Sequence, residues 1–359
     1  MKVLIVCIYP PHHAPSQRYR IEQYIDFLQA NGFHITFSSA LSKRDYQYYF
    51  SKGHFFRKAW MVVKSFTKRM KEVFKASNYD IIFVHREAFM LGTSFFERQF
   101  AKRSKVIYSF EDAIWLPRIS EGNKKWDFLK KSTKTGEIIQ HAHLIFAGNN
   151  YLKNYALPFN QRTVIIPSTM DTNLYQPKYN ISKDKICIGW SGSFSTIVHF
   201  ESCIPILKQI KAKYGERVYF KVIGDGKFVN KDLQIKGISW NKDTEVSDLH
   251  ELDIGLMPLP NDEWANGKCA LKGLQYMALE IPTIMSPVGV NKEIIQDGEN
   301  GFLATTENEW VDKLSRLIDS IDLRKNIGEK GRQTVVKHYS VDAIKPLYLQ
   351  YFKEVAKRK

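Results

Sequence analysis

The chain has 359 residues, which exceeds what one ordinary hydrophobic core organises and suits two domains. Its formal net charge of +16 predicts an anionic partner, such as a phosphorylated substrate, anionic lipid headgroups or nucleic acid. The four cysteines are scattered outside any metal-ligand spacing and predict reduced thiols, and no apolar run approaches the length needed to cross a bilayer, so we expect a soluble or peripheral protein.

The first 40 residues predict a strand, a helix and a second strand, over 2–8, 18–30 and 34–38. The two strands of such a βαβ unit are parallel, so the proline-rich loop over 9–17 lies at the carboxyl edge of a sheet, where open α/β folds bind ligands. Ser16 in this loop and Arg18 at the predicted helix start are therefore candidate ligand contacts. The alternative is that the loop is only a rigid connector.

Residues 42–75 alternate basic and aromatic side chains and predict two helices. Helices of this composition lie in membrane interfaces, with rings among the acyl chains and basic groups at anionic headgroups. We expect residues 43–71 to attach the protein to an anionic membrane surface. In the alternative interpretation the aromatic residues form ordinary core and the basic residues a solvated face.

Two further buried strands end in polar residues. His85, Arg86 and Glu87 follow the apolar run over 81–84, and Glu111 and Asp112 follow the next strand. Because the ends of parallel strands meet at one sheet edge, these carboxylates could accept hydroxyl hydrogen bonds or act as a base. They could also serve only as helix caps.

After a polar stretch that predicts a linker, a second α/β series begins. Its first strand ends in Gly192 and Ser193, small residues that allow close approach of a ligand to the backbone before a helix. The stretch over 266–289 predicts a loop, a helix and a buried strand, with Lys268 and Lys272 at the helix start as a candidate phosphate site. A solvated basic helix end is the alternative. Neither half has a dinucleotide fingerprint or a P-loop, which argues against an NAD-dependent enzyme, and no nucleic-acid-binding module is present.

The order of these elements resembles that of the GT-B glycosyltransferases, and four motifs resemble glycosyltransferase family 4. These motifs are VIIPSTMDTNLYQP, IGWSGSFST, LKGLQYMALEIPTI and VGVNKEIIQDGENGFLA, and together they spread over nearly the whole chain. The resemblance implies an α/β protein of two Rossmann-like, doubly wound parallel-sheet domains facing across a cleft. Its parts would be an acceptor-binding domain over 1–170, a linker over 171–184, a donor domain over 185–340, and a terminal helix over 341–359 that returns to the first domain.

The resemblance also implies the chemistry. Family members transfer a sugar from a nucleotide-sugar to an acceptor hydroxyl with retention of configuration and without a metal. The Glu-x7-Glu motif that frames their donor corresponds here to Gly267 and Gln275, so both carboxylates are absent. The catalytic residues implied are Glu111, Asp112 and Lys272, and the donor-binding residues implied are Ser16, Arg18, Gly192, Ser193, Lys268, Lys272, Gln275, Val290 and Asn291.

The sequence therefore predicts a retaining glycosyltransferase at the cytoplasmic face of the cell membrane, acting in surface polysaccharide or glycolipid synthesis. Its donor would be a UDP-, GDP- or ADP-sugar and its acceptor a lipid-linked or membrane-proximal glycan, with no cofactor, no metal and no nucleic-acid partner. The alternative, favoured by the missing carboxylates, is a catalytically degenerate GT-B-like assembly protein that binds a nucleotide-sugar or a lipid.

Overall fold

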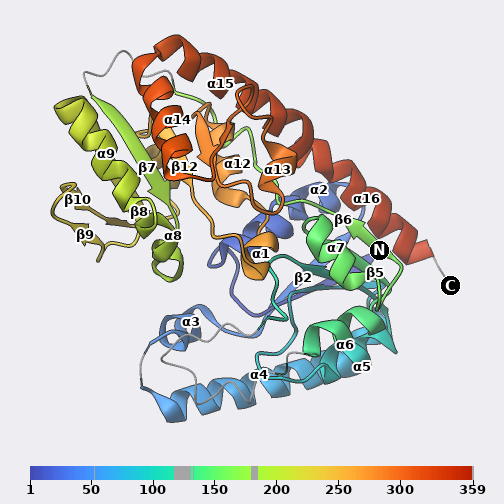
Figure 1. The fold of residues 1–359 in the computed structure, drawn as a ribbon. Coiled ribbons are helices and arrows are strands. Elements are labelled where there is room, and N and C mark those ends of the chain that lie inside the picture. The colour runs from blue at the N-terminus through green and yellow to red at the C-terminus, as the bar shows by residue number, and fades with distance from the viewer. Residues whose placement is uncertain (52, 117–130, 132, 179–184, 358–359) are drawn as a thin grey trace. The chain divides into compact units, whose positions relative to one another are not determined.

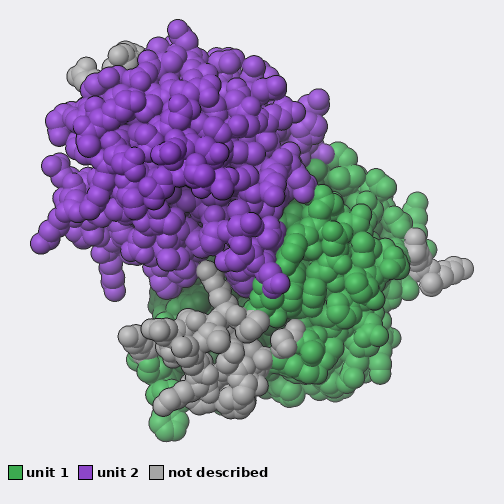
Figure 2. Space-filling view, in the orientation of Figure 1, with its two compact units in different colours: residues 1–168, 344–359 green, residues 169–343 purple. Residues whose placement is uncertain are grey.

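The computed structural model describes residues 1–51, 53–116, 131, 133–178 and 185–357. Two compact units make up the chain: residues 1–168 with 344–359, and residues 169–343 (Figure 2). Part of the predicted linker, over 179–184, and Lys52 of the basic and aromatic stretch lie outside the described residues.

The first unit contains a six-stranded parallel sheet (Figure 1). Its strands pair in the order β2-β1-β3-β4-β5-β6, and short apolar runs buried on both faces form the central ones. Their bounds are β1 Lys2–Cys7, β2 His34–Ser39, β3 Ile81–His85, β4 Lys105–Phe110, β5 Leu144–Ala147 and β6 Thr163–Ile165.

The predicted helix over 18–30 is wrong in its start and its continuity. The helical segment begins at Pro15, because proline at the first helical turn has no N–H to leave unsatisfied and a preset φ. It breaks at Ile21, whose backbone leaves helical geometry (φ −144°, ψ −39°). The result is α1 Pro15–Arg20, a 3-10 turn Glu22–Tyr24 and α2 Ile25–Ala30. Arg18 therefore lies inside a helix and not at its start.

The two helices predicted in 42–75 are confirmed as α3 Lys43–Tyr49 and α4 Phe55–Lys75. Ser42 caps α3 by accepting from the Asp45 amide at 3.2 Å. Helix α4 lies beside α5 Phe95–Ala101, which lies beside α6 Lys134–His141, on one side of the sheet (Figure 1). The short α7 Asn150–Ala156 connects β5 to β6.

The terminal helix α16, Val341–Lys357, packs on the first unit from Ile344 onward. Tyr348 stacks on Tyr24 with ring centroids 3.9 Å apart, and Phe352 stacks on Phe83 of β3 at 5.9 Å. The Tyr348 hydroxyl also donates to the Arg20 carbonyl. Buried aromatic contacts thus hold the last segment of the chain against the first sheet.

The second unit contains another six-stranded parallel sheet, in the order β11-β8-β7-β12-β13-β14. The core of this unit contains the fully buried Trp190 of β7 and apolar residues of the helices that cover the sheet. The strands are β7 Ile186–Ser191, β8 Val218–Gly224, β11 Ile238–Ser239, β12 Ile254–Met257, β13 Thr283–Met285 and β14 Phe302–Leu303, with an antiparallel hairpin of β9 Val229–Asn230 and β10 Ile235–Lys236 beside β8.

Helices connect these strands. They are α8 Ile197–Glu201, α9 Ile204–Tyr214, α10 Glu245–Leu249, α11 Glu263–Asn266, α12 Leu271–Ala278, α13 Asn291–Ile294, α14 Glu307–Asp319 and α15 Ile321–Thr334. The prediction of two doubly wound parallel-sheet domains is confirmed. It succeeds because each buried strand is a short apolar run between breakers, a signal contained within a few residues.

Candidate functional site

Polar groups meet at the carboxyl edge of the first sheet, where the adjacent strands β1, β3 and β4 end. Arg86 lies between the two predicted carboxylates. Its Nη2 is 2.7 Å from Glu111 Oε1 and 2.8 Å from Asp112 Oδ2, and its Nε donates to Glu111 Oε1 at 2.9 Å. The structure therefore brings Glu111 and Asp112 together through an arginine that the predicted site did not include.

The two carboxylates differ in their access to solvent. The Glu111 side chain is 7% exposed and the Asp112 side chain 19% exposed, while Arg86 is 30% exposed. Burial acts to raise the pKa of Glu111, but Arg86, and then His85, outweigh it and leave that pKa below its ordinary value. Asp112 is thus the carboxylate that a ligand reaches more easily, and Glu111 is the one that fixes Arg86.

Ser16 of α1 contacts the same cluster through His85. The Ser16 hydroxyl lies 3.3 Å from His85 Nε2, which is also 3.8 Å from Glu111 Oε1. Burial lowers the pKa of His85 to about 4, so its imidazole is neutral at pH 7. Buried His85 Nδ1 and Glu111 Oε2 have no hydrogen-bond partner among the described residues. Buried polar atoms are normally satisfied, so this edge is built for something more than packing.

The backbone at this edge is strained. His12, Arg86 and Asp112 follow three neighbouring strands and all adopt left-handed φ values, of 68°, 60° and 62°. Such a conformation is uncommon for residues with a Cβ and is concentrated at functional sites. Arg18, by contrast, turns its guanidinium toward its neighbour Tyr19, 4.5 Å from the ring centroid.

At the carboxyl edge of the second sheet, Lys272 lies above the end of β7. Its Nζ is 4.4 Å from the Trp190 ring centroid and 3.4 Å from Thr196 Oγ1. A Cβ on Gly192 would come within 2.8 Å of Lys272 Nζ and 2.2 Å of the Trp190 ring. Gly192 is therefore the residue that allows the lysine to approach the strand end.

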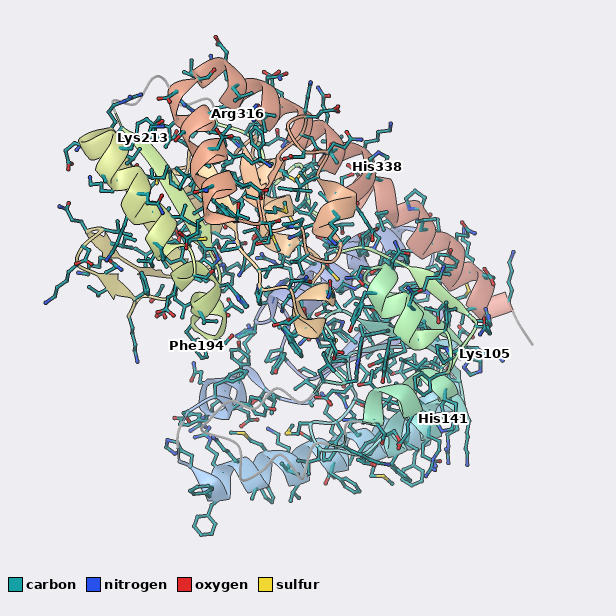
Figure 3. The ribbon with its side chains drawn as sticks, in the orientation of Figure 1. Lys105, His141, Phe194, Lys213, Arg316 and His338 are labelled. Carbon is teal, nitrogen blue, oxygen red and sulfur yellow. The ribbon has the colours of Figure 1, made fainter. Side chains whose placement is uncertain are left out.

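Ser193 and Thr196 form the turn after Gly192 through a capping box, in which each side chain bonds the backbone of the other residue. The Ser193 hydroxyl is also 2.9 Å from that of Ser195. Phe194 of the same turn projects from the unit, 71% exposed (Figure 3). Hydroxyl groups and a lysine thus share one strand end, a combination that suits phosphate oxygens.

The prediction that Lys268 begins the helix with Lys272 is wrong. Ala270 adopts a left-handed φ of 54°, which separates the short α11 from α12, and α12 begins at Leu271. Lys272 is then the second residue of α12. Lys268 precedes that helix, with its Nζ 5.1 Å from the Trp264 ring centroid.

Gln275 belongs to a buried polar cluster that the sequence did not reveal. Its amide nitrogen donates to Tyr175 Oη at 3.0 Å and to Glu245 Oε1 at 3.1 Å. Tyr175 donates to Glu245 Oε2 at 2.8 Å, and Trp240 donates to Glu245 Oε1 at 2.9 Å. Only 4% of Gln275 is exposed, so this glutamine is fixed by its neighbours. No local motif points to Glu245, because two of its three partners, Tyr175 and Gln275, are distant in the chain.

Val290 and Asn291 are both buried at the start of α13. The Asn291 amide donates to the Ser286 carbonyl at 2.9 Å, while its Oδ1 has no hydrogen-bond partner among the described residues. Their side chains contribute to the packing of this strand end. Across the described part of the chain, no group of three or more His, Cys, Asp or Glu side chains could hold a metal ion, and no helix is long and apolar enough to cross a membrane.

Part of the chain is similar in sequence to known glycosyltransferases. Residues 186–320 match the family model described as Glycosyl transferases group 1. The chain is 33% identical over 125 residues to an uncharacterized glycosyltransferase of Methanocaldococcus jannaschii, covering 32% of this chain and 34% of that protein. It is 24% identical over 203 residues to the capsular polysaccharide biosynthesis glycosyltransferase CapM of Staphylococcus aureus, covering 52% of each. The matched segments span between about a third and about half of these relatives.

Solved structures show the fold over the whole chain. Sucrose-phosphate synthase of Thermosynechococcus elongatus superposes with a TM-score of 0.72 at 14% identity, covering 99% of this chain and 98% of that one. HepE of Anabaena, solved in complex with UDP-glucose, superposes with a TM-score of 0.65 at 15% identity, covering 99% and 100%. The fold is thus that of the GT-B glycosyltransferases.

Proposed function

We propose that this chain, which carries a glycosyl transferases group 1 domain on the GT-B fold, is a retaining glycosyltransferase. It takes a sugar from a nucleotide-sugar and delivers it to a lipid-linked or membrane-proximal glycan in surface polysaccharide or glycolipid synthesis, as a peripheral protein at the inner face of the cell membrane. The observation that carries the proposal is Lys272 above the Gly192 strand end, beside the hydroxyl-bearing turn.

On the donor side, Lys272 and Ser193 hold the diphosphate of the nucleotide-sugar. Negative charge grows on this diphosphate as the bond to the anomeric carbon breaks, and a fixed ammonium group then stabilises the transition state more than the ground state. The solved complexes of HepE with UDP and with UDP-glucose support a uridine nucleotide as the first donor to test. GDP- and ADP-sugars remain in the same chemical class.

Gln275 supports the donor site from within the protein. Its amide nitrogen bonds Tyr175 and Glu245, and an amide can both donate to and accept from the hydroxyl groups of a ribose. Lys268, Val290, Asn291 and Arg18 complete the set of donor contacts that we propose, with the two buried residues acting through their backbone.

On the acceptor side, Asp112 accepts a hydrogen bond from the acceptor hydroxyl. It is more exposed than Glu111, and Arg86 holds its Oδ2 at 2.8 Å. Arg86 is therefore a positioning residue, which pairs with Asp112 and lowers the pKa of Glu111 against the effect of its burial. Ser16 joins this side through His85.

A second candidate function is a catalytically degenerate GT-B-like assembly protein that binds a nucleotide-sugar or a lipid. The absence of carboxylates at Gly267 and Gln275 favours it. The two functions differ in turnover and agree in nucleotide binding.

A panel of UDP-, GDP- and ADP-sugars screened by thermal shift, followed by hydrolysis of the stabilising compound without acceptor, tests the proposal. A stabilising nucleotide-sugar that is slowly hydrolysed by the wild type and not by Lys272→Ala supports the transferase. Stabilisation without hydrolysis, or with hydrolysis unchanged in Lys272→Ala, favours the degenerate protein. If no nucleotide-sugar stabilises the chain, the transferase loses its donor site and only a degenerate protein that binds a lipid is left.

A further inference from the structure

Helix α4 buries only a narrow row of residues against the rest of the first unit. This row recurs every fourth residue and therefore occupies one side of the helix. Arg69 in the row is fully buried: its guanidinium donates to the Cys7 carbonyl at 2.6 Å, the Ala88 carbonyl at 2.7 Å and Glu72 Oε2 at 2.6 Å. The row consists of Met61, Ser65, Arg69 and Val73.

These contacts fix the rotation of α4 about its own axis. Besides the bonds of Arg69, the Ser65 hydroxyl donates to the Ala40 carbonyl at 3.1 Å and Lys68 Nζ to the Ser39 carbonyl at 2.6 Å. Charge-assisted hydrogen bonds to a buried guanidinium are strong. The opposite side of α4 is therefore presented to solvent as a preformed surface, with side chains projecting along its length (Figure 3).

That opposite side is apolar. We call it the outer row, and its members are spaced by three, four or seven residues, which places them on one side of the helix: Phe56, Trp60, Val63, Thr67 and Phe74. Phe56 is 95% exposed, Phe74 73%, Trp60 66% and Val63 52%. Single exposed apolar residues are ordinary, but an aligned row of large ones marks an interaction surface.

A basic row runs along one flank of the outer row and consists of Arg57, Lys64, Lys68, Lys71 and Lys75. Lys64, Lys71 and Lys75 are exposed, while Arg57 and Lys68 are half-buried. The single acidic residue of α4, Glu72, turns inward and bonds Arg69 and Ser38. A helix with an apolar face and a basic flank fits the boundary between headgroups and acyl chains of an anionic bilayer.

Helix α3 does not extend this surface, although the sequence grouped it with α4. Its Tyr46 and Tyr49 rings pack on Tyr9, at centroid distances of 5.6 and 6.1 Å, and the Tyr46 hydroxyl donates to the His13 carbonyl at 3.1 Å. Two of the eight aromatic residues in 43–71 thus hold the loop after β1 and are not available to a membrane.

We infer that the outer row and the basic row of α4 form a docking surface for an anionic phospholipid bilayer, on which α4 lies along the membrane plane. The inference deepens the proposed function by naming the surface that contacts the membrane. It rests on that function only in assuming that the acceptor glycan is lipid-linked or membrane-proximal. A second copy of the chain is a poorer occupant, because a symmetric contact would set two basic rows against each other.

Sedimentation of the full chain with vesicles of phosphatidylcholine alone, or mixed with phosphatidylglycerol, tests the inference. We expect binding to the mixed vesicles that weakens with salt, since exposed charges are screened. Phe56→Ser with Trp60→Ser should weaken binding at least tenfold at every salt concentration. Lys71→Ser with Lys75→Ser should weaken it about thirtyfold and flatten its salt dependence, at about 1 kcal/mol per basic residue.

Val229→Ser with Lys330→Ser, exposed positions of the second unit, is the matched control and should bind as the wild type does. Phe74→Asp gives a second outer-row variant, and thermal unfolding checks that each variant is folded. Three results would overturn the inference. The first is equal binding to neutral vesicles, and the second is wild-type binding by both outer-row variants. The third is no vesicle binding together with a dimer that Phe56→Ser disperses. The vesicle assay contains no sugar donor, so its result does not depend on sugar transfer. A protein that binds vesicles but transfers no sugar in a separate assay would refute the proposed function and leave this surface in place.

Discussion

The carboxyl edges of the two sheets carry charged groups in different surroundings. At the first edge, one arginine, Arg86, pairs with two carboxylates, Glu111 and Asp112, within hydrogen-bond distance. At the second edge, Lys272 rests on the Trp190 ring and a threonine hydroxyl. A carboxylate oriented by an arginine suits a neutral hydroxyl donor, and an ammonium group on an aromatic face suits a diphosphate. Two domains of the same fold class can therefore suit ligands of different charge, a neutral hydroxyl and an anionic diphosphate.

The largest expected effect lies at the second edge. Lys272→Ala should lower kcat by a factor on the order of 10² with a smaller change in KM, because one preorganised charge donor to the leaving group is lost. Lys330→Ala is the matched control, since Lys330 is an exposed lysine of α15 outside the proposed donor contacts, and it should leave turnover unchanged. If turnover of Lys272→Ala stays within about twofold of the wild type, the lysine at the start of α12 is only a solvated basic group.

Substitution in the buried cluster around Gln275 should change the stability of the protein. Gln275→Ala removes donors to Tyr175 and Glu245 and should lower the free energy of unfolding by about 2 kcal/mol, as expected for hydrogen bonds to a charged group. Nucleotide binding should weaken as well. Denaturant unfolding measures the first effect and thermal shift with nucleotide the second; an unchanged unfolding midpoint would mean that the cluster carries no stability.

At the first edge, Arg86→Gln should shift the acidic limb of the kcat/KM profile to higher pH. Arg86 is the main group that holds the pKa of Glu111 below its ordinary value against the effect of burial, and His85, Asp112 and Arg20 also face it. Without Arg86, burial raises that pKa, and we expect about a tenfold loss at pH 6 relative to pH 8.

The sign for stability follows from the same shift. A lowered pKa in the folded state stabilises the wild type above the unfolded pKa of about 4.3, and this contribution is lost as pH falls through the folded pKa. Arg86→Gln should lose it at neutral pH, while Arg86→Lys keeps part of it. Arg103→Gln, an exposed arginine that bonds Gln99, serves as control. A pH profile identical to that of the wild type would leave Arg86 with a purely structural role.

The smallest expected effect concerns the turn after β7. Ser193→Ala removes the capping box with Thr196 and should lower the free energy of unfolding by about 1 kcal/mol. Ser202→Ala, which removes a hydroxyl bonded only within its own turn, should cost less. If Ser193→Ala leaves both stability and nucleotide binding unchanged, Lys272 acts at this edge without the turn.

The sequence by itself determined the alternation of strands and helices, the two parallel sheets and the presence of polar residues at their carboxyl edges. Each of these depends on apolar runs and breakers within a few residues of one another, and such local signals survive without knowledge of the partners. The break at Ile21 and the helix start at Leu271 were missed because a single irregular residue, Ile21, and a single left-handed residue, Ala270, interrupt otherwise helical stretches.

Only the tertiary structure decided which polar groups meet. Arg86 reaches Glu111 across two neighbouring strands, Gln275 reaches Tyr175 and Glu245 across the second unit, and α16 returns to the first sheet. It also separated α3, whose rings turn inward, from α4, whose outer row faces solvent. Hydrogen bonds and burial depend on groups that are far apart in the chain, so no pattern within a single segment specifies them.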